Sequence, residues 1–168
     1  MIRQVTVLTG ASLALAGVLA FAQTARNSDA SSGAPTKAQL ERVIATWASR
    51  DVDKAAVFYA KDPGLVFYDI APRKYTGWAE YDKGARDMFK SVTSLTMKMN
   101  DDAVVHVSGN MAWSSATVDG EIVGTDGSRL KVEARWTTVW ESRPTGWLIV
   151  HEHFSNPLPE PPPPKPKA

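Results

Sequence analysis

Two of the three histidines in this chain, His151 and His153, stand one residue apart in the stretch "HEHFS" (151–155). Histidine titrates near neutral pH, and its neutral ring is a common metal ligand, so the pair could transfer protons or bind a metal. A metal site needs a third ligand. His106 or Asp69 could supply one, but no spacing in the sequence requires it. We therefore predict no metal and no cofactor, which leaves proton transfer or hydrogen bonds that only stabilise the fold.

Asp69 is the third candidate catalytic residue, and it follows the short apolar run "LVFY" (65–68). A carboxylate there, with His151 or His153 close by, could move a proton on a small carbonyl compound. Aspartate is also common at the start of a turn, where its side chain caps the backbone, and "DIAPRK" (69–74) is such a turn. A catalytic base and a turn cap both remain open for Asp69.

The histidine pair lies at the end of a predicted strand, 146–155, which forms a hairpin with a predicted strand at 129–141. A loop of four residues, 143–146, fixes the pairing of the two strands. The resulting pairs are His151 with Thr138 and His153 with Trp136.

Side chains alternate between the two faces of a strand, so this register puts both histidines on one largely aromatic face. That face comprises Trp136, Thr138, Trp140, Trp147, Ile149, His151 and His153. Glu152 falls on the opposite face, diagonal to Arg135 and within reach of an ion pair. We predict that the aromatic face lines a ligand cavity, because such cavities are mostly apolar with few polar groups, and the reverse assignment remains open.

Helix signals precede the strands along the chain. Thr36 and Gln39 form a capping-box pattern, and one apolar stripe follows it at Leu40, Val43, Ile44 and Trp47. A second short helix is predicted after Asp51 or Asp53, then a strand at 65–70 and a helix at 78–92. Strands with period-two patterns follow at 94–100, 103–108, 111–124, 129–141 and 146–155. This order predicts an α+β fold with an antiparallel sheet.

Three segments resemble a known superfamily: "RDVDKAAVFYAKDPGLVFYD" (50–69), "YTGWAEYDKG" (75–84) and "RWTTVWESRPTGWLIVHEHFS" (135–155). They resemble the nuclear-transport-factor-2-like (NTF2-like) superfamily, in its SnoaL-like and ketosteroid-isomerase-like branch. The last hairpin is also similar to that of the kinase II association domain. The resemblance implies a cone-shaped curved antiparallel sheet wrapped around N-terminal helices, enclosing a cavity. Members often dimerise through the sheet, and they include enzymes, binding proteins and assembly modules.

The resemblance also places Asp69 where ketosteroid isomerase carries its general base. That enzyme polarises its substrate with a tyrosine and a protonated aspartate. Val43 and Thr138 stand at the matching positions here, so both of those donors are missing. Steroid isomerisation by that machinery is therefore not expected, while a different proton transfer remains open.

The aromatic residues of the domain can serve either the core or a cavity. We predict ligand binding by Trp47, Tyr68, Trp78, Trp113, Trp136 and Thr138. The favoured function is a domain that binds a small, largely apolar ligand or acts as a dimerising module. The alternative is a proton-transfer enzyme of isomerase, cyclase or dehydratase type that uses Asp69 with His151 or His153.

The two ends lie outside the predicted domain, 36–156. Residues 1–22 have a basic start, an apolar run and "AFA" before Gln23, which is typical of a cleaved secretory signal peptide. We therefore predict a periplasmic or secreted protein with no membrane anchor after cleavage, the alternative being an uncleaved anchor. The polar stretch 23–35 indicates a flexible linker, and 157–168 a proline-rich tail.

Composition narrows the expected partners. The chain has no cysteine, which excludes disulfides and thiolate metal sites. It has 19 basic and 18 acidic residues, and the predicted signal peptide holds one of the basic residues and none of the acidic ones. Because the remaining charges balance, no nucleic-acid partner is expected. The expected partners are a small-molecule ligand and a second copy of the chain.

Overall fold

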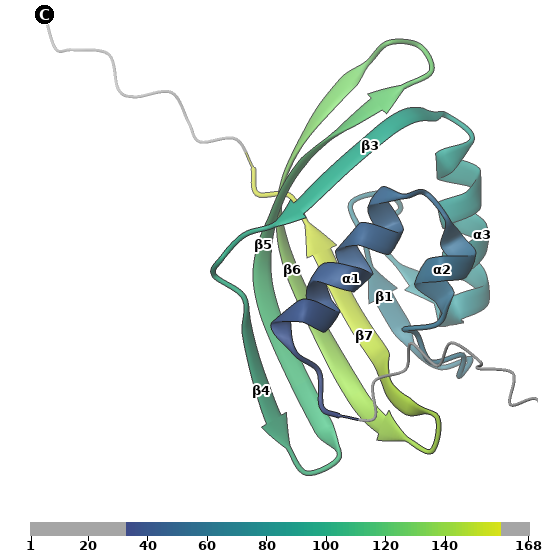
Figure 1. The fold of residues 1–168 in the computed structure, drawn as a ribbon. Coiled ribbons are helices and arrows are strands. Elements are labelled where there is room, and N and C mark those ends of the chain that lie inside the picture. Colours follow the sequence, from purple (N-terminus) through teal and green to yellow (C-terminus); the bar gives the residue numbers. More distant parts are fainter. Residues whose placement is uncertain (1–32, 159–168) are drawn as a thin grey trace, which may run out of the picture.

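A computed structural model describes residues 33–158, and its elements follow the predicted order, helices first and strands last (Figure 1). The helices are α1 (Lys37–Ala48), α2 (Val52–Ala56) and α3 (Gly77–Phe89). The strands are β1 (Val66–Tyr68), β2 (Tyr75–Thr76), β3 (Val92–Met99), β4 (Val104–Ser108), β5 (Met111–Gly124), β6 (Arg129–Arg143) and β7 (Gly146–Ser155). The predicted α+β class is confirmed.

The first two helices begin at the predicted caps. The Thr36 side chain accepts a hydrogen bond from the Gln39 backbone N–H at 3.2 Å, and Asp51 accepts one from Lys54 N–H at 3.2 Å. Such caps satisfy backbone donors that the first helical turn leaves unpaired. The apolar stripe of α1 is buried, and the helix packs across β3.

The strands form one curved sheet in the order β2-β1-β7-β6-β5-β3, and β4 also pairs with β5. Neighbouring strands are antiparallel except β1 and β7, which run parallel. Figure 1 shows the sheet bending around the three helices, which lie on its concave side. Gly120 allows the close approach of β5 to β3, because a Cβ there would lie 1.9 Å from the Thr96 carbonyl oxygen.

The final hairpin begins in the predicted register but does not keep it. The pairs nearest the turn are as predicted: Ser142 with Trp147, and Trp140 with Ile149. The register then shifts at a β-bulge, where Val150 is the additional residue of β7. Beyond it the pairs are Val139 with His151, Thr138 with Glu152, Thr137 with His153 and Trp136 with Phe154. The predicted pairing of His151 with Thr138 and of His153 with Trp136 is therefore wrong.

One extra residue exchanges the faces of every side chain that follows it. Glu152 and Phe154 turn to the concave side, and His151 and His153 turn to the convex side. The predicted ion pair of Glu152 with Arg135 is also wrong, since Glu152 is buried on the concave side.

The bulge lies where β7 changes its neighbour. Ile149 exchanges backbone hydrogen bonds with Phe58 and Ala60, at 2.7 and 2.9 Å. From His151 onward β7 pairs instead with β1. The alternation of apolar and polar residues along β6 and β7 gives no sign of this change of partner. A prediction from that alternation therefore continues one register along the whole hairpin.

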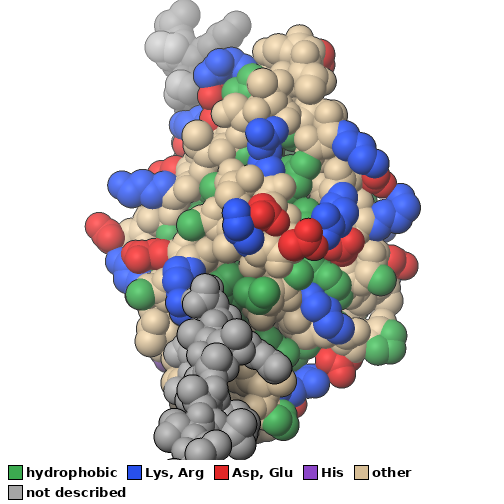
Figure 2. Space-filling model, turned by 45° about the vertical axis from the view of Figure 1, so that its right-hand side comes forward, with side chains coloured by type: hydrophobic (Ala, Val, Ile, Leu, Met, Phe, Trp, Pro, Cys, Tyr) green, Lys and Arg blue, Asp and Glu red, His purple; other side chains and the backbone are tan. Residues whose placement is uncertain are grey.

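On the face drawn in Figure 2, Lys and Arg side chains are interspersed with Asp and Glu side chains. Among the described residues, charged side chains form several ion pairs, for example those of Arg86 with Asp82 and Asp53. This face therefore has no extended field of one sign, which fits the balanced composition.

The predicted signal peptide 1–22 lies outside the described residues, as do most of the linker 23–35 and most of the tail 157–168. Between residues 33 and 158, no helix has the length and apolar character needed to cross a membrane.

Candidate functional site

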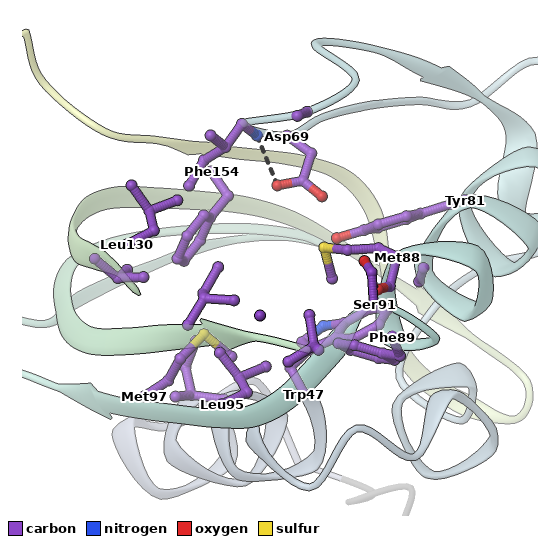
Figure 3. Close-up of a pocket in the computed structure, with 18 of the residues that line it drawn as sticks. Trp47, Asp69, Tyr81, Met88, Phe89, Ser91, Leu95, Met97, Leu130 and Phe154 are labelled. Carbon is purple, nitrogen blue, oxygen red and sulfur yellow. Dashed lines mark hydrogen bonds between the residues drawn. The ribbon is translucent and has the colours of Figure 1, made fainter. Parts of the chain in front are cut away.

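A cavity of about 320 Å³ lies between the helices and the concave side of the sheet (Figure 3). Most of its lining is apolar, with Met88, Leu95, Met97 and Ile122 among the side chains that form it. The polar groups of the lining are few: Asp69, Tyr81, Ser91, Ser128 and Glu152. A mostly apolar cavity with a small number of polar groups is typical of small-molecule sites.

Asp69 enters this cavity from the loop that follows β1. Figure 3 shows its carboxyl pointing into the cavity, with Trp47, Leu95 and Met97 on the opposite side. One carboxyl oxygen accepts the Ile70 backbone N–H at 2.7 Å, so Asp69 does cap its own turn. Among residues 33–158, the second oxygen has no hydrogen-bond donor. Burial raises the pKa of Asp69 to about 6, although the Ile70 N–H opposes the shift.

Glu152 is the second carboxyl of the cavity, and its residue is only 2% exposed. One oxygen, Oε2, accepts the hydroxyls of Tyr59 at 2.8 Å and Tyr81 at 3.0 Å. The other, Oε1, accepts the indole N–H of Trp136. The Tyr59 hydroxyl in turn accepts the indole N–H of Trp47 at 2.8 Å. Side chains from the segment after α2, from α3 and from β6 thus converge on one carboxyl, and Trp47 of α1 is linked to it through Tyr59.

Burial raises the pKa of Glu152 to about 7, because an ionised carboxyl loses its hydration there. The nearby charge of Asp69 adds to this shift, and the hydrogen bonds from Trp136, Tyr59 and Tyr81 oppose it. Burial, together with the charge of Glu152, also raises the pKa of the Tyr59 and Tyr81 hydroxyls. Both carboxyls of the cavity can therefore change protonation near neutral pH.

The two predicted catalytic histidines lie in a groove on the convex side of β7. His151 and His153 line it together with Tyr68, whose ring contacts both imidazoles edge-on at centroid distances of 5.6 and 5.7 Å. The His151 Nδ1 is 2.7 Å from the carbonyl oxygen of Val66. Asp69 lines both this groove and the inner cavity, so it forms part of the wall between them.

The sequence model of the SnoaL-like domain family matches residues 37–159, which include every helix and strand described above. The chain belongs to the SnoaL-like domain family. The superfamily predicted from the sequence is thus confirmed. No curated protein is similar enough in sequence to match the chain.

Solved structures share the fold of this SnoaL-like domain. An NTF2-like superfamily protein from Salmonella enterica is 24% identical, with a TM-score of 0.66 over 74% of this chain and 89% of that one. A candidate dehydratase of the NTF2-like family from Streptomyces avermitilis is 16% identical, with a TM-score of 0.62 over 70% and 91%. A candidate kinase II association domain from Xanthomonas campestris is 20% identical, with a TM-score of 0.58 over 72% and 88%. At these identities the likeness shows the fold alone.

The six predicted ligand-binding residues of the SnoaL-like domain occupy different environments. Trp47 lines the cavity, and Trp136 lies behind it and reaches Glu152. Trp78 packs against Tyr59 and has the Lys61 ammonium 3.6 Å from its ring centroid. Tyr68 lines the outer groove.

The remaining two, Trp113 and Thr138, lie away from the inner cavity. Trp113 is 46% exposed on the convex side, stacked on His106. The Thr138 hydroxyl is buried beside Ser114 and accepts the indole N–H of Trp140 at 2.6 Å. Val43, at the position of the missing tyrosine, is fully buried and, like Thr138, does not line the cavity.

Sequence reasoning missed Glu152, Tyr59 and Tyr81 as a connected group. The register error put Glu152 on the wrong face, and no sequence pattern indicated that Tyr59 and Tyr81 meet at its carboxyl. One signal was available: buried Tyr and Trp side chains need acceptors for their polar hydrogens. A core with so many of these rings therefore requires buried acceptors, and the acid between two histidines was a candidate.

Within the described part of the chain, no three His, Cys, Asp or Glu side chains are grouped closely enough to hold a metal ion.

Proposed function

We propose that this SnoaL-like domain binds a small, largely apolar molecule in the cavity between its helices and its sheet. The observation that carries the proposal is the cavity itself: about 320 Å³, mostly apolar walls, and a carboxyl of Asp69 aimed inward. Its volume is at the lower end of the usual range for small-molecule pockets, which indicates a compact ligand of one to three rings.

The proposal is tested by filling the cavity. Ile122 lines it, and Ile122→Trp would occupy space that a ligand needs. Val107→Trp is the control, because Val107 is 51% exposed on β4 and adds the same indole outside the cavity. We expect the neutral dye N-phenylnaphthylamine to bind the wild type and Val107→Trp, with affinity reduced at least tenfold in Ile122→Trp. Equal binding to all three proteins would contradict a cavity site.

A second candidate function, proton transfer, is supported by Asp69. Its carboxyl is partly buried, has an oxygen without a donor among residues 33–158, and has a pKa near 6. A base with these properties can accept a proton from a carbon beside a carbonyl and return it to another carbon, which isomerises the ligand. Tyr81 lines the same cavity. When Glu152 is protonated it can donate to Tyr81, and the tyrosine hydroxyl is then free to donate to a developing oxyanion.

Proton transfer is tested by deuterium exchange into a panel of small apolar ketones in D₂O, followed by NMR. We expect exchange with wild type, and a loss of at least about a hundredfold in Asp69→Asn, since general-base catalysis contributes that much or more. Asp87→Asn, an exposed change on α3, is the control. If Asp69→Asn retains the wild-type exchange rate, Asp69 is not the base.

Two further proposals concern partners and location. The convex side of the sheet, where Tyr68, Val104 and Trp113 are each more than 40% exposed, is our candidate surface for a homodimer. NTF2-like domains often dimerise, which supports it.

Export rests on the signal-peptide pattern in residues 1–22, and cell fractionation of the full-length chain tests it.

A further inference from the structure

The lining of the inner cavity includes acidic side chains and no basic ones among the described residues. Two are carboxyls, Asp69 and Glu152, and the others are neutral. Within the described residues, none of the lining side chains belongs to Lys, Arg or His. Basic side chains line the outer groove instead, on the other face of the sheet: Arg73, Lys74, His151 and His153.

We infer that the cavity selects ligands that carry an amine, and that it rejects ligands of the same shape that carry a carboxylate. This inference rests on the proposed function, since it specifies the ligand of the same cavity. An ammonium group would be a counter-ion for the two carboxyls of the cavity, and the apolar walls would contact the hydrocarbon part of the ligand.

Asp69 provides the contact for the ammonium. Its carboxyl points into the cavity, and only one of its oxygens is used by the Ile70 N–H. The second oxygen can accept a charge-assisted hydrogen bond from an ammonium, which is stronger than a bond between neutral groups. A ligand bound here would lie against the rings of Trp47 and Phe89, which also line the cavity. Aromatic faces attract cations further.

Glu152 acts on the ligand through its electrostatic field, without a direct hydrogen bond. Its two oxygens already accept three hydrogen bonds, from Tyr59, Tyr81 and Trp136. An ammonium beside Asp69 would favour the ionised state of both carboxyls, whereas a carboxylate would add a third negative group in surroundings of low dielectric. The same arrangement therefore attracts one kind of ligand and repels the other, which is how a site becomes specific.

The test uses three ligands with one skeleton: naphthylmethylamine, naphthylmethanol and naphthoate. Each displaces bound N-phenylnaphthylamine from the full-length protein at neutral pH. We expect the amine to bind at least about tenfold more tightly than the alcohol, and the carboxylate to bind most weakly. If naphthoate equals or exceeds the amine, the inference is wrong although the cavity still binds ligands. If neither the dye nor any of the three binds, the proposed function itself fails.

Asp69→Asn separates the contact from the shape of the cavity. It should remove most of the advantage of the amine over the alcohol and leave the affinity for the alcohol within about threefold of wild type. An amine preference that survives in Asp69→Asn would overturn the assignment to Asp69. If the variant does not fold, the comparison of the three ligands on the wild type still decides the inference.

Discussion

The two sides of strand β7 carry titratable residues in alternation, and their surroundings differ sharply. Glu152 is inside, 2% exposed, with three donors on its carboxyl. His151 and His153 are outside, in an open groove beside Tyr68, Arg73 and Lys74. Of three consecutive residues in one strand, Glu152 thus lines the apolar, acidic cavity, and His151 and His153 line the basic, aromatic groove.

This difference shows that the position of a titratable group relative to the core, more than its type, decides what it does. In the sequence, His151 and His153 are the first candidates, because histidine is the residue type whose ordinary pKa lies closest to neutral. In the structure, burial gives that property to Glu152 and Asp69, whose pKa values rise to about 7 and about 6. The inner face is therefore where substitutions should have the largest effects.

Removing the inner carboxyl is expected to have the largest effect. Glu152→Leu would leave two tyrosine hydroxyls and the Trp136 N–H buried without their acceptor, which should destabilise the domain by roughly 3–5 kcal/mol. His153→Leu, one position along on the exposed face, should change the free energy of unfolding by less than about 0.5 kcal/mol. Urea denaturation measures both. Similar losses in the two variants would refute the contrast between the faces.

The second prediction concerns the pH dependence of stability. The pKa of Glu152 is raised from 4.5 in the unfolded chain to about 7 in the fold, so the native state retains a proton that the unfolded state has lost. This contribution to stability is complete below pH 4.5 and is lost as the pH rises through 7. Relative to Glu152→Gln, the wild type should lose roughly 2–3 kcal/mol between pH 4.5 and pH 8.

His151→Gln is the control on the outer face, and it should retain the full wild-type loss of stability between pH 4.5 and pH 8. Urea titrations at a series of pH values give the comparison. A Glu152→Gln variant that follows the wild-type pH profile would show that Glu152 does not titrate in this range.

The sequence predicted the order and the limits of most elements because their signals are local. Capping residues at Thr36 and Asp51, apolar stripes and hairpin turns are each contained in a few residues. The register of β7 was predicted only as far as Ile149. The register shifts next to the point where Ile149 bonds with Phe58 and Ala60, some ninety residues earlier in the chain. The alternation of residues along one hairpin cannot indicate a contact with so distant a segment.

The candidate site was predictable to the same extent. Asp69 and Trp47 were among the predicted site residues, and both line the cavity. The resemblance indicated Asp69 at the end of β1, and the apolar stripe indicated the inner face of α1. Glu152 was lost with the register. Its tyrosine partners come from two other elements, and only the packed fold brings them to one carboxyl.

Asp69 supplies the third prediction, with a smaller effect because its side chain is only partly buried. Its pKa is raised from 3.8 to about 6, so the ionised form is disfavoured in the fold and Asp69 destabilises the native state above pH 6. Asp69→Asn should therefore be more stable than wild type by roughly 1 kcal/mol at pH 8, after allowance for screening by solvent, and should lose this advantage near pH 4. Urea denaturation at the two pH values measures it. A destabilised Asn variant at pH 8 would mean that Asp69 matters mainly as the cap of its turn.

The outer face is expected to show the smallest effect on folding and a clear effect on assembly. Trp113 is 46% exposed on the convex side, so Trp113→Arg should change the stability of the folded subunit by less than about 1 kcal/mol. If this side joins two copies, the same change places unpaired charges in the interface and should convert a dimer to a monomer, as measured by light scattering. Val57→Arg is the control, because Val57 is 54% exposed beside α2 on the helical side.

A wild type that is already monomeric would remove the convex face as a dimer surface. A dimer that persists in Trp113→Arg would move the interface elsewhere, and the division between an inner face that binds and an outer face that assembles would no longer hold.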